Sequence, residues 1–326
     1  AAPRASGNPL LSGWRACCCC FAVVLLAGEG AANTRASRYP EPPEPEPACG
    51  AISLPPFAGN ATVFGERSAS RWWLAPIVVE KHRLVLCKIA KNASSGWMRL
   101  VRRMAGAKDW TANPYTASSL KSYRYLKDYG REAAARMMVD PTWTKIAMVR
   151  DPLERLLSAY LDKIRNEADW PKILDEYRDA LWWHDAPLRN MTFAEFIDRV
   201  AVGTMEGRDH TSGGRMNQHW SFQHRECNLD FWAPAYTRIF HMHRGGCSKR
   251  TMLSEFLGIL RRNSRAPGEL AALLDTFDDR NAAGAAIASH ATDHASRVWY
   301  TEETYRKALA IYKPDYDFYG LEPPSA

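Results

Sequence analysis

The feature that constrains the fold most is a strand–turn–helix pattern that occurs twice. In the first copy, the apolar run 84–89 is short and rich in branched side chains, which predicts a buried strand, and apolar residues then recur at helical spacing over 97–104. In the second copy, 145–149 is the predicted strand and 153–164 carries the helical stripe. Successive units of this kind are typical of a parallel sheet, so the sequence predicts an α/β fold.

The turn of the first unit, residues 91–96, reads KNASSG. A tight turn before a helix points several backbone N–H groups and the positive end of the helix dipole at one spot, which suits an anion. The glycine spacing of a Walker A loop is missing, so an ordinary nucleoside triphosphate is not the expected ligand. This stretch alone also leaves open an ordinary strand-to-helix connection without a ligand.

The turn of the second unit combines a helix start with an arginine. Asp151 is a good N-cap, Pro152 takes the favoured first helical position, and Glu154 completes a capping-box-like pattern. Arg150 therefore lies at the carboxyl end of a predicted parallel strand, where open α/β sheets bind ligands. Ser158 flanks the apolar stripe two turns into the helix. Taken alone, such an arginine is usually a solvated charge and such a serine is usually idle.

The overall charge agrees with an anionic ligand. The chain of 326 residues has a formal net charge of +7, which favours phosphates, sulfates or anionic glycans. Its hydrophobic fraction of 46% indicates a folded protein. A nucleic-acid partner is not expected, because the sequence has no zinc-finger spacing, no RNP-like run and no basic zipper.

Four regions are predicted along the chain. Residues 1–32 contain the apolar run ACCCCFAVVLLA and read as a signal peptide or a truncated signal anchor. Residues 33–70, with EPPEPEP, read as a proline-rich stem or linker. Residues 71–321 form the folded domain, and 322–326 are a tail. A cytosolic enzyme with an unusual N-terminus is the alternative.

Within the folded domain, residues 266–295 are expected to be helical in part, and 301–311 to be a helix ended by Lys313-Pro314. A lumenal environment would permit a disulfide, and Cys227–Cys247 would close a modest loop, although the sequence leaves the connectivity open. The other cysteines after the N-terminal apolar run are Cys49, in the predicted stem, and Cys87, and glycosylation sequons begin at Asn60, Asn92 and Asn190.

Four motifs resemble those of Golgi carbohydrate sulfotransferases, which act on acceptors such as chondroitin, dermatan and the HNK-1 glycan. CKIAKNASSGW resembles their 5′-phosphosulfate-binding loop, C-P-x-P-K-x-A-C/S-T-N-W, and VRDPLERLLSAYLDK resembles their 3′-phosphate-binding segment. NQHW followed by Cys227 resembles an H-W…C segment, and YKPDYDFYGL resembles the terminal Y-x-x-D-F-x-x-F-G-Y. The first motif departs from the family at Lys88, Ala90 and Gly96, which leaves the detailed shape of the loop open.

The resemblance implies a single catalytic domain with a P-loop-like, parallel-sheet sulfotransferase fold. It implies 3′-phosphoadenosine 5′-phosphosulfate as co-substrate, a hydroxyl of a carbohydrate as acceptor, and no metal. It further implies a glycoprotein of the Golgi lumen, held as a type II membrane protein or secreted. The residues that it assigns to the co-substrate are Lys91, Asn92, Ala93, Ser94, Ser95, Gly96, Trp97, Arg150 and Ser158. Lys91 is also the expected catalytic cation.

A general base must accept the proton of the acceptor hydroxyl. His219 is the expected base, because it lies in the matching motif and an imidazole titrates near neutrality. His184, Glu154 and Asp151 are further candidates, and His219 could instead only order its loop.

Two other functions remain open from the sequence. One is a metal-binding module built from zinc-type donors, namely His219, His224, Cys227, His241, His243 and Cys247. The other is a non-catalytic descendant of the family that binds glycan.

Overall fold

The computed structural model describes residues 52, 76–116, 119, 121, 123–166, 171–183, 187–205, 217–242, 249–277 and 296–324. The chain divides into two units, Ala1–Pro45 and Glu46–Ala326, and every described residue belongs to the second. The predicted signal segment lies outside the described residues, and so does the predicted stem except for Ile52. Among the described helices, none is long and apolar enough to cross a membrane.

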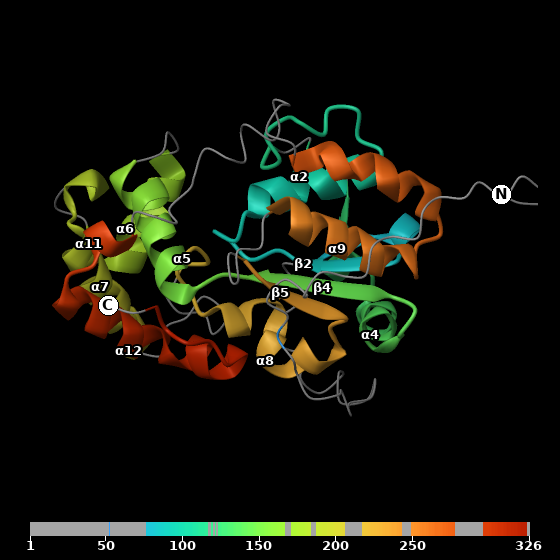
Figure 1. The fold of residues 1–326 in the computed structure, drawn as a ribbon. Helices are drawn as coiled ribbons and strands as arrows, with labels where there is room; N and C mark the ends of the chain where they lie inside the picture. Colours follow the sequence, from blue (N-terminus) through green and yellow to red (C-terminus); the bar gives the residue numbers. More distant parts are fainter. Residues whose placement is uncertain are drawn as a thin grey trace, which may run out of the picture. The chain divides into compact units, whose positions relative to one another are not determined.

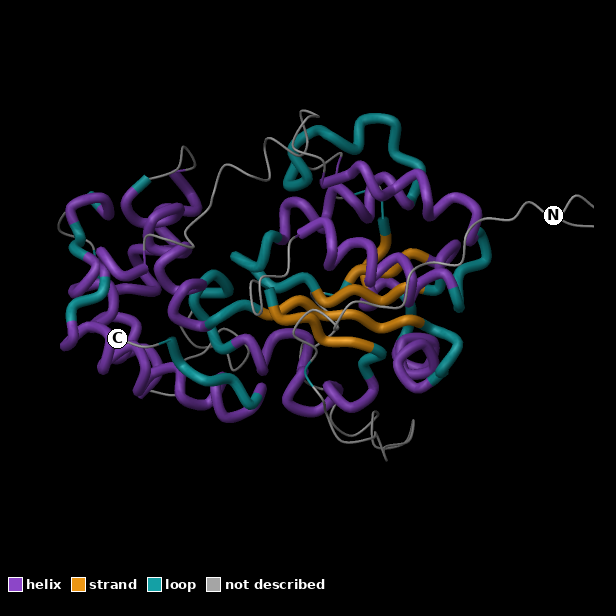
Figure 2. Tube along the Cα trace, viewed as in Figure 1, coloured by secondary structure: helices purple, strands orange, loops and turns teal. Residues whose placement is uncertain are grey.

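The centre of the domain is a five-stranded sheet in the order β3-β1-β2-β4-β5 (Figures 1 and 2). The strands are β1 (Ile77–Val79), β2 (Leu84–Cys87), β3 (Arg124–Tyr125), β4 (Thr144–Val149) and β5 (Arg238–His241). The three strands β2, β4 and β5 are parallel, and β1 pairs antiparallel with both of its neighbours. The α/β fold and its two predicted strands are thus confirmed.

Each face of the sheet is covered by helices, as the strand pattern requires. Alternate strand residues, such as Leu86 and Met148, belong to a core with α2 (Ser94–Met104), α9 (Lys249–Arg261) and the 3₁₀ segment Pro267–Phe277. Residues of the opposite parity belong to a second core on the other face, where α4 (Arg131–Val139) and α8 (Leu229–Trp232) lie (Figure 1).

A group of helices extends this second core beyond one end of the strands (Figure 1). They are α5 (Pro152–Ala159), α6 (Pro171–Leu181), α7 (Phe193–Met205), α11 (Ser296–Trp299) and α12 (Glu302–Tyr319). After α5 the chain continues as a π-helical turn, Tyr160–Arg165, where the sequence predicts a regular α-helix. A π-helical turn contains one residue more than an α-helical turn, so it changes which of the following side chains lie on the same face of the helix.

The predicted end of the last helix is wrong. α12 runs through Pro314 and ends at Tyr319, where it is capped by Gly320 in a left-handed conformation. A proline inside a helix removes one hydrogen bond and costs about 3 kcal/mol. Burial of the Tyr316 and Tyr319 rings beyond the proline offsets this cost, together with the hydrogen bonds that the buried Asp315 carboxylate accepts from Gln223 and His224. The predicted helical part of 266–295 is a 3₁₀ segment up to Phe277, and the rest lies outside the described residues.

The structure contains a disulfide whose pairing the sequence left open. Cys227 is bonded to Cys87, 140 residues away, and not to Cys247, which lies outside the described residues. Cys87 is the last residue of β2 and Cys227 lies in the 3₁₀ segment Gln223–Asn228. The bond therefore joins the loop that resembles the 5′-phosphosulfate-binding loop to the segment that resembles the H-W…C motif. A bond from Cys227 to Cys247 would have closed a shorter ring.

Candidate functional site

The two predicted turns meet at one edge of the sheet. β2 and β4 are parallel neighbours, with Cys87 beside Ala147, so the segments that follow them leave the sheet at the same end. Arg150 Nη1 donates to the carbonyl oxygen of Lys91 at 3.5 Å. Lys91 and Arg150, 59 residues apart in the chain, are therefore adjacent.

The loop before α2 has the backbone shape of an anion-binding turn. Lys91 and Ala93 both have positive φ angles, 69° and 52°, and Ala93 is the N-cap of α2. The sign of φ therefore alternates along this loop, and such alternation points successive backbone N–H groups at one spot. Gly96 and Trp97 donate their backbone N–H groups to the carbonyl of Ala93. The backbone N–H groups just before Gly96, at the start of the helix, are therefore the ones that can bind a ligand.

Two hydroxyls stand at the start of the same helix. Ser94 Oγ and Ser95 Oγ lie 3.1 and 3.0 Å from the hydroxyl of Tyr115. Tyr115 is largely exposed, and it comes from the connection that follows α2. The phenol therefore covers the serine hydroxyls that the sequence assigns to the co-substrate.

Asn92 has a different environment from the rest of the loop. Its side chain is buried, and its Nδ2 atom donates to the carbonyl of Met148 at 2.8 Å and to Gln223 Oε1 at 2.7 Å. Gln223 also bonds both backbone groups of Arg150, at 3.0 and 2.8 Å. Asn92 thus ties its loop to the end of β4 and turns its side chain away from solvent.

The start of α5 holds Arg150 by its side chain as well. Asp151 caps the helix as predicted, accepting from the N–H groups of Leu153 and Glu154. The Glu154 carboxylate lies 3.2 Å from Arg150 Nε, and both side chains are largely buried. Ser158 is buried one helical turn after Glu154, on the same face of α5. Arg150 and Ser158 are therefore on the same side of this helix.

A buried arginine joins the loop to the histidine segment. Arg155 donates to three backbone carbonyls, those of Ala90, Ser221 and Gln218, and is almost completely buried. Charged donors form the stronger class of hydrogen bonds, at about 1.5–3 kcal/mol each. Arg155 thereby fixes the distance between the anion-binding loop and the segment that carries His219.

The last motif braces this arrangement from α12. Asp315 is fully buried, and its carboxylate accepts from the backbone N–H groups of Gln223 and His224, both at 3.0 Å. His224 Nδ1 lies 2.6 Å from the same carboxylate. The motif YKPDYDFYGL, through Asp315, therefore holds Gln223 in place. Gln223 in turn holds Asn92 and Arg150 by hydrogen bonds.

Lys91 points across the site to the turn after α5. Its Nζ atom lies 2.9 Å from Asp162 Oδ2, and Lys163 Nζ lies 2.8 Å from the same oxygen. Burial lowers the pKa of Lys91, and the carboxylate of Asp162 opposes that change. Burial raises the pKa of Asp162, but the two ammonium groups outweigh it and hold the pKa well below its usual range.

His219 lies beside this charge cluster. Its Nδ1 atom is 2.6 Å from Asn217 Oδ1, an oxygen that also accepts from the His219 backbone N–H. Since an amide oxygen only accepts, Nδ1 carries the proton and Nε2 keeps a lone pair in the neutral ring. Burial, followed by the charges of Lys163, Lys91 and Arg155, places the pKa of His219 well below its usual value.

The donors considered for a metal site are only partly described by the structure. Cys227 is oxidised, so its sulfur is not available as a zinc ligand. His184, His243 and Cys247 lie outside the described residues. Among the residues that are described, no group of three His, Cys, Asp or Glu side chains is arranged to hold a metal.

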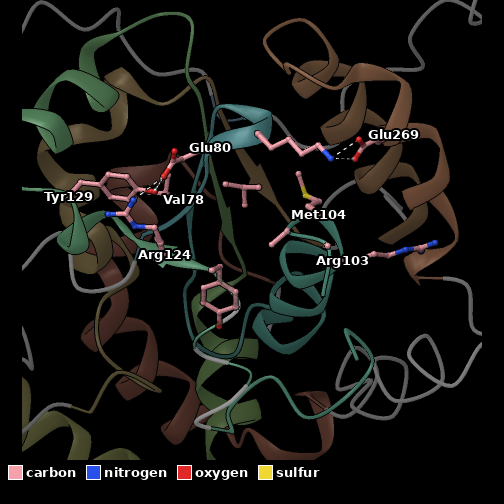
Figure 3. Close-up of a pocket in the computed structure, with 12 residues that line it drawn as sticks. Val78, Glu80, Arg103, Met104, Arg124, Tyr129 and Glu269 are labelled. Atoms are coloured by element: carbon pink, nitrogen blue, oxygen red, sulfur yellow. Dashed lines mark hydrogen bonds and ion pairs between the residues drawn. The ribbon is translucent and has the colours of Figure 1, made fainter. Parts of the chain in front are cut away.

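A cavity of about 260 Å³ lies at the other end of β2 (Figure 3). It is lined by the residues before this strand, among them Val78 and Glu80, and by the end of α2. Its rim carries the ion pairs Arg124–Glu80 and Lys81–Glu269, in which the charges balance (Figure 3). Arg103 also lines this cavity, but none of the residues of the site does, so the cavity is separate from the site.

Comparison with known proteins agrees with this geometry. A model of the sulfotransferase family matches residues 76–322, which include every element of the site. The chain belongs to the sulfotransferase family. The predicted family and fold are therefore confirmed.

Its relatives within the family are carbohydrate sulfotransferases. The chain is 27% identical over 177 residues to human carbohydrate sulfotransferase 14, a match that covers 53% of this chain and 43% of that protein. It is 32% identical over 94 residues to mouse carbohydrate sulfotransferase 8, covering 27% of this chain and 21% of the relative. These matches span less than half the length of either relative. No solved structure gives a significant match.

Several residues of this candidate site were not predicted. Arg155, Gln223 and Asp315 act through buried hydrogen bonds between distant segments. Arg155 and Asp315 stand in two of the resembling segments, VRDPLERLLSAYLDK and YKPDYDFYGL, which was the available clue to them, whereas Gln223 lies outside the quoted motif letters. Asp162 and Lys163 belong to VRDPLERLLSAYLDK, the segment that resembles the 3′-phosphate-binding segment of the family. Their place in this segment was the sequence signal that could have identified them. Tyr115 lies in a connection without a recognisable motif.

Proposed function

We propose that the protein transfers a sulfuryl group from 3′-phosphoadenosine 5′-phosphosulfate to a hydroxyl of a carbohydrate. The observation that supports this most is the convergence of Lys91, Arg150 and the N-terminus of α2 at one edge of the sheet, within a domain of the sulfotransferase family. Two cations, the free N–H groups of a helix start and two serine hydroxyls are donors that fit a nucleotide with anions at both its 3′ and 5′ ends.

The two anionic ends are assigned to different elements. The loop after β2, with Lys91, Ser94 and Ser95, would hold the 5′-phosphosulfate, and Arg150 with Ser158 would hold the 3′-phosphate. When bound, the co-substrate supplies an activated sulfuryl group on a phosphate leaving group. Lys91 places a positive charge in a site with little water, where stabilisation of the developing negative charge is strong.

His219 is the proposed general base. Its Nδ1–H is held by Asn217, and its Nε2 lone pair is the atom that would accept the proton of the acceptor hydroxyl. The lowered pKa keeps the ring neutral at physiological pH. Asp162 is a poorer base because its pKa is lowered, and Asp151 is a helix cap that also accepts from the Tyr316 hydroxyl.

The disulfide supports a place in the secretory pathway. Cys87–Cys227 joins two parts of the site, and such bonds persist in oxidising compartments. We propose that the protein acts in the Golgi lumen or after secretion, and that in the Golgi the N-terminal segment attaches it to the membrane. Protease protection of the protein in intact Golgi vesicles, with loss of protection on adding detergent, tests this placement.

The function is tested by transfer of radioactive sulfate from labelled co-substrate to a panel of glycans and small hydroxyl compounds. Incorporation into a glycan, abolished in Lys91→Ala, is the expected result. Glycan binding without incorporation would instead identify a non-catalytic glycan-binding protein. Incorporation only into small hydroxyl compounds would contradict the carbohydrate acceptor while retaining the transfer reaction.

A further inference from the structure

The ion pair between Lys91 and Asp162 differs from the surface ion pairs of the domain. The Lys91 side chain is 12% exposed, compared with 44% for Lys307 and 68% for Lys313 in their pairs with aspartates. Exposed pairs contribute little to stability because water and salt screen them. The Lys91 pair is shielded, so its charges interact more strongly.

Asp162 is the acidic member of a positively charged cluster. The groups that face Lys91 come from each element around it: Arg150 from the end of β4, Asp162 and Lys163 from the π-helical turn, and His219 from the segment before Cys227. Two lysines share the same oxygen of Asp162. Among these neighbours, Asp162 therefore supplies the negative charge that balances Lys91 before an anion binds.

This position matters for the proton on Lys91. A buried lysine among other cations loses its proton more readily than a lysine in water, and a carboxylate nearby reverses that tendency. A neutral Lys91 would have no charge with which to stabilise a leaving group. The carboxylate thus preserves the property of Lys91 that the proposed function requires.

We propose that Asp162 is a positioning residue that holds the Lys91 ammonium, charged and in place, until the anionic sulfuryl donor takes it over. The proposal rests on the proposed function for its catalytic meaning, whereas the ion pair itself is independent of activity. It assigns Asp162 no contact with the reacting atoms. The donor's negative charge replaces that of Asp162 when Lys91 turns to it.

The test compares three variants with the wild type. Asp162→Asn keeps the size and an acceptor oxygen but removes the charge, and Asp162→Glu keeps the charge. Lys163→Gln removes a cation that competes for the same carboxylate. Circular dichroism melting of each variant confirms that the protein is folded at the temperature of the assay.

The first readout does not depend on activity. The reactivity of Lys91 towards trace acetic anhydride is followed against pH by mass spectrometry, because only the neutral amine reacts. The pH midpoint is expected to fall by about one to three units in Asp162→Asn, to return towards the wild-type value in Asp162→Glu, and to rise in Lys163→Gln. An unchanged midpoint in Asp162→Asn would overturn the proposal.

The second readout is the pH profile of kcat for sulfuryl transfer. The alkaline limb of Asp162→Asn should move to lower pH by the same amount, with kcat approaching the wild-type value at the acid end of the range. A loss of kcat that is equal at every pH would contradict the proposal and indicate a structural role. If the wild type transfers no sulfate while the labelling midpoint still shifts, the ion pair is supported and the proposed function alone fails.

Discussion

Cys87 and Cys227 join the end of a central strand to the segment that carries the histidine, across 140 residues of chain. Lys91 follows one cysteine by four residues, and His219 precedes the other by eight. The covalent bond therefore limits how far the anion-binding loop and the histidine segment can separate. Arg155 and Asp315 hold the same two segments by hydrogen bonds.

The disulfide should contribute substantially to stability. Closing a ring of this size in the unfolded chain corresponds to about 4–5 kcal/mol in the chain-entropy model, and removal of a native disulfide typically costs about 2–5 kcal/mol. Cys227→Ser is expected to lower the free energy of unfolding by an amount in that range, as measured by urea denaturation. Dithiothreitol should bring the wild type to the same midpoint and leave Cys227→Ser unchanged. A separate loss in the variant on reduction would point to a different pairing.

Lys91→Ala should lower kcat about a hundredfold, equivalent to about 3 kcal/mol, with a much smaller effect on donor binding. The reason is that a charge acting on the leaving group stabilises the transition state more than the bound donor. Single-turnover kinetics and donor titration separate the two effects. Lys88→Ala, in the same loop, is the matched control and should retain kcat. Unchanged turnover with only a raised KM in Lys91→Ala would refute the leaving-group role.

Arg150 and Ser158 should determine the preference for a 3′-phosphate. The wild type is expected to bind 3′-phosphoadenosine 5′-phosphate more tightly than adenosine 5′-phosphate, with each contact supplying roughly 10- to 150-fold. Arg150→Ala should lose most of this preference and Ser158→Ala a smaller part, since a neutral hydroxyl is the weaker partner. Calorimetry with both nucleotides measures it. Equal weakening of both nucleotides in Arg150→Ala would show that Arg150 holds the fold or the 5′ end.

His219 should produce the acid limb of the pH profile. Its pKa in the folded protein lies well below 6.5, so turnover should stay constant down to about pH 6.5 and fall only at lower pH. His219→Gln is expected to lower kcat by a factor of about 10²–10⁴ and to remove that limb. An acid limb that persists in the variant would assign it to another group.

The same shift affects stability. The unfolded state binds a proton at His219 near pH 6.5, whereas the folded state resists it until lower pH, so the contribution of His219 to stability falls as the pH drops below 6.5. Urea denaturation of the wild type and His219→Gln at pH 7.5 and 5.5 tests this sign. The variant should lose less stability than the wild type on acidification. Equal losses would show that the ring titrates normally.

Asn92 should carry no glycan even when the protein is made in secretory cells, although Asn92-Ala93-Ser94 is a sequon. Its side chain is 1% exposed and its Nδ2 atom makes two hydrogen bonds inside the domain. Asn190, in the sequon Asn190-Met191-Thr192, is exposed and serves as the comparison site. Peptide mass spectrometry after enzymatic deglycosylation measures the occupancy of both. Full occupancy of Asn92 in active protein would be incompatible with the loop described here.

Local patterns predicted the parts of the fold that depend on nearby residues. The strand ahead of Lys91, the strand ahead of Arg150 and the cap at Asp151 all followed from periodicity and helix-start chemistry. The continuation through Pro314 was missed because the burial of Asp315 and Tyr316 against other segments overrides the local effect of a proline.

The missed part of the site has a similar explanation. Regular helical spacing does not predict where Asp162 lies, because the π-helical turn changes the phase of the residues after Tyr160. Gln223 was missed because its partners, Asn92 and Arg150, are distant in the chain. Contacts of this type depend on the completed tertiary structure, and no pattern in a single segment indicates them.

The brace from α12 also sets the order in which the protein can become functional during its synthesis. The ribosome makes the loop of Lys91 and the segment of His219 well before it reaches Asp315, which accepts hydrogen bonds from Gln223 and His224. A nascent chain that stops short of Asp315 therefore contains the reactive side chains without the carboxylate that orders them. The proposed donor site is completed only after α12 has emerged and packed, so a prematurely terminated chain would not gain the full site.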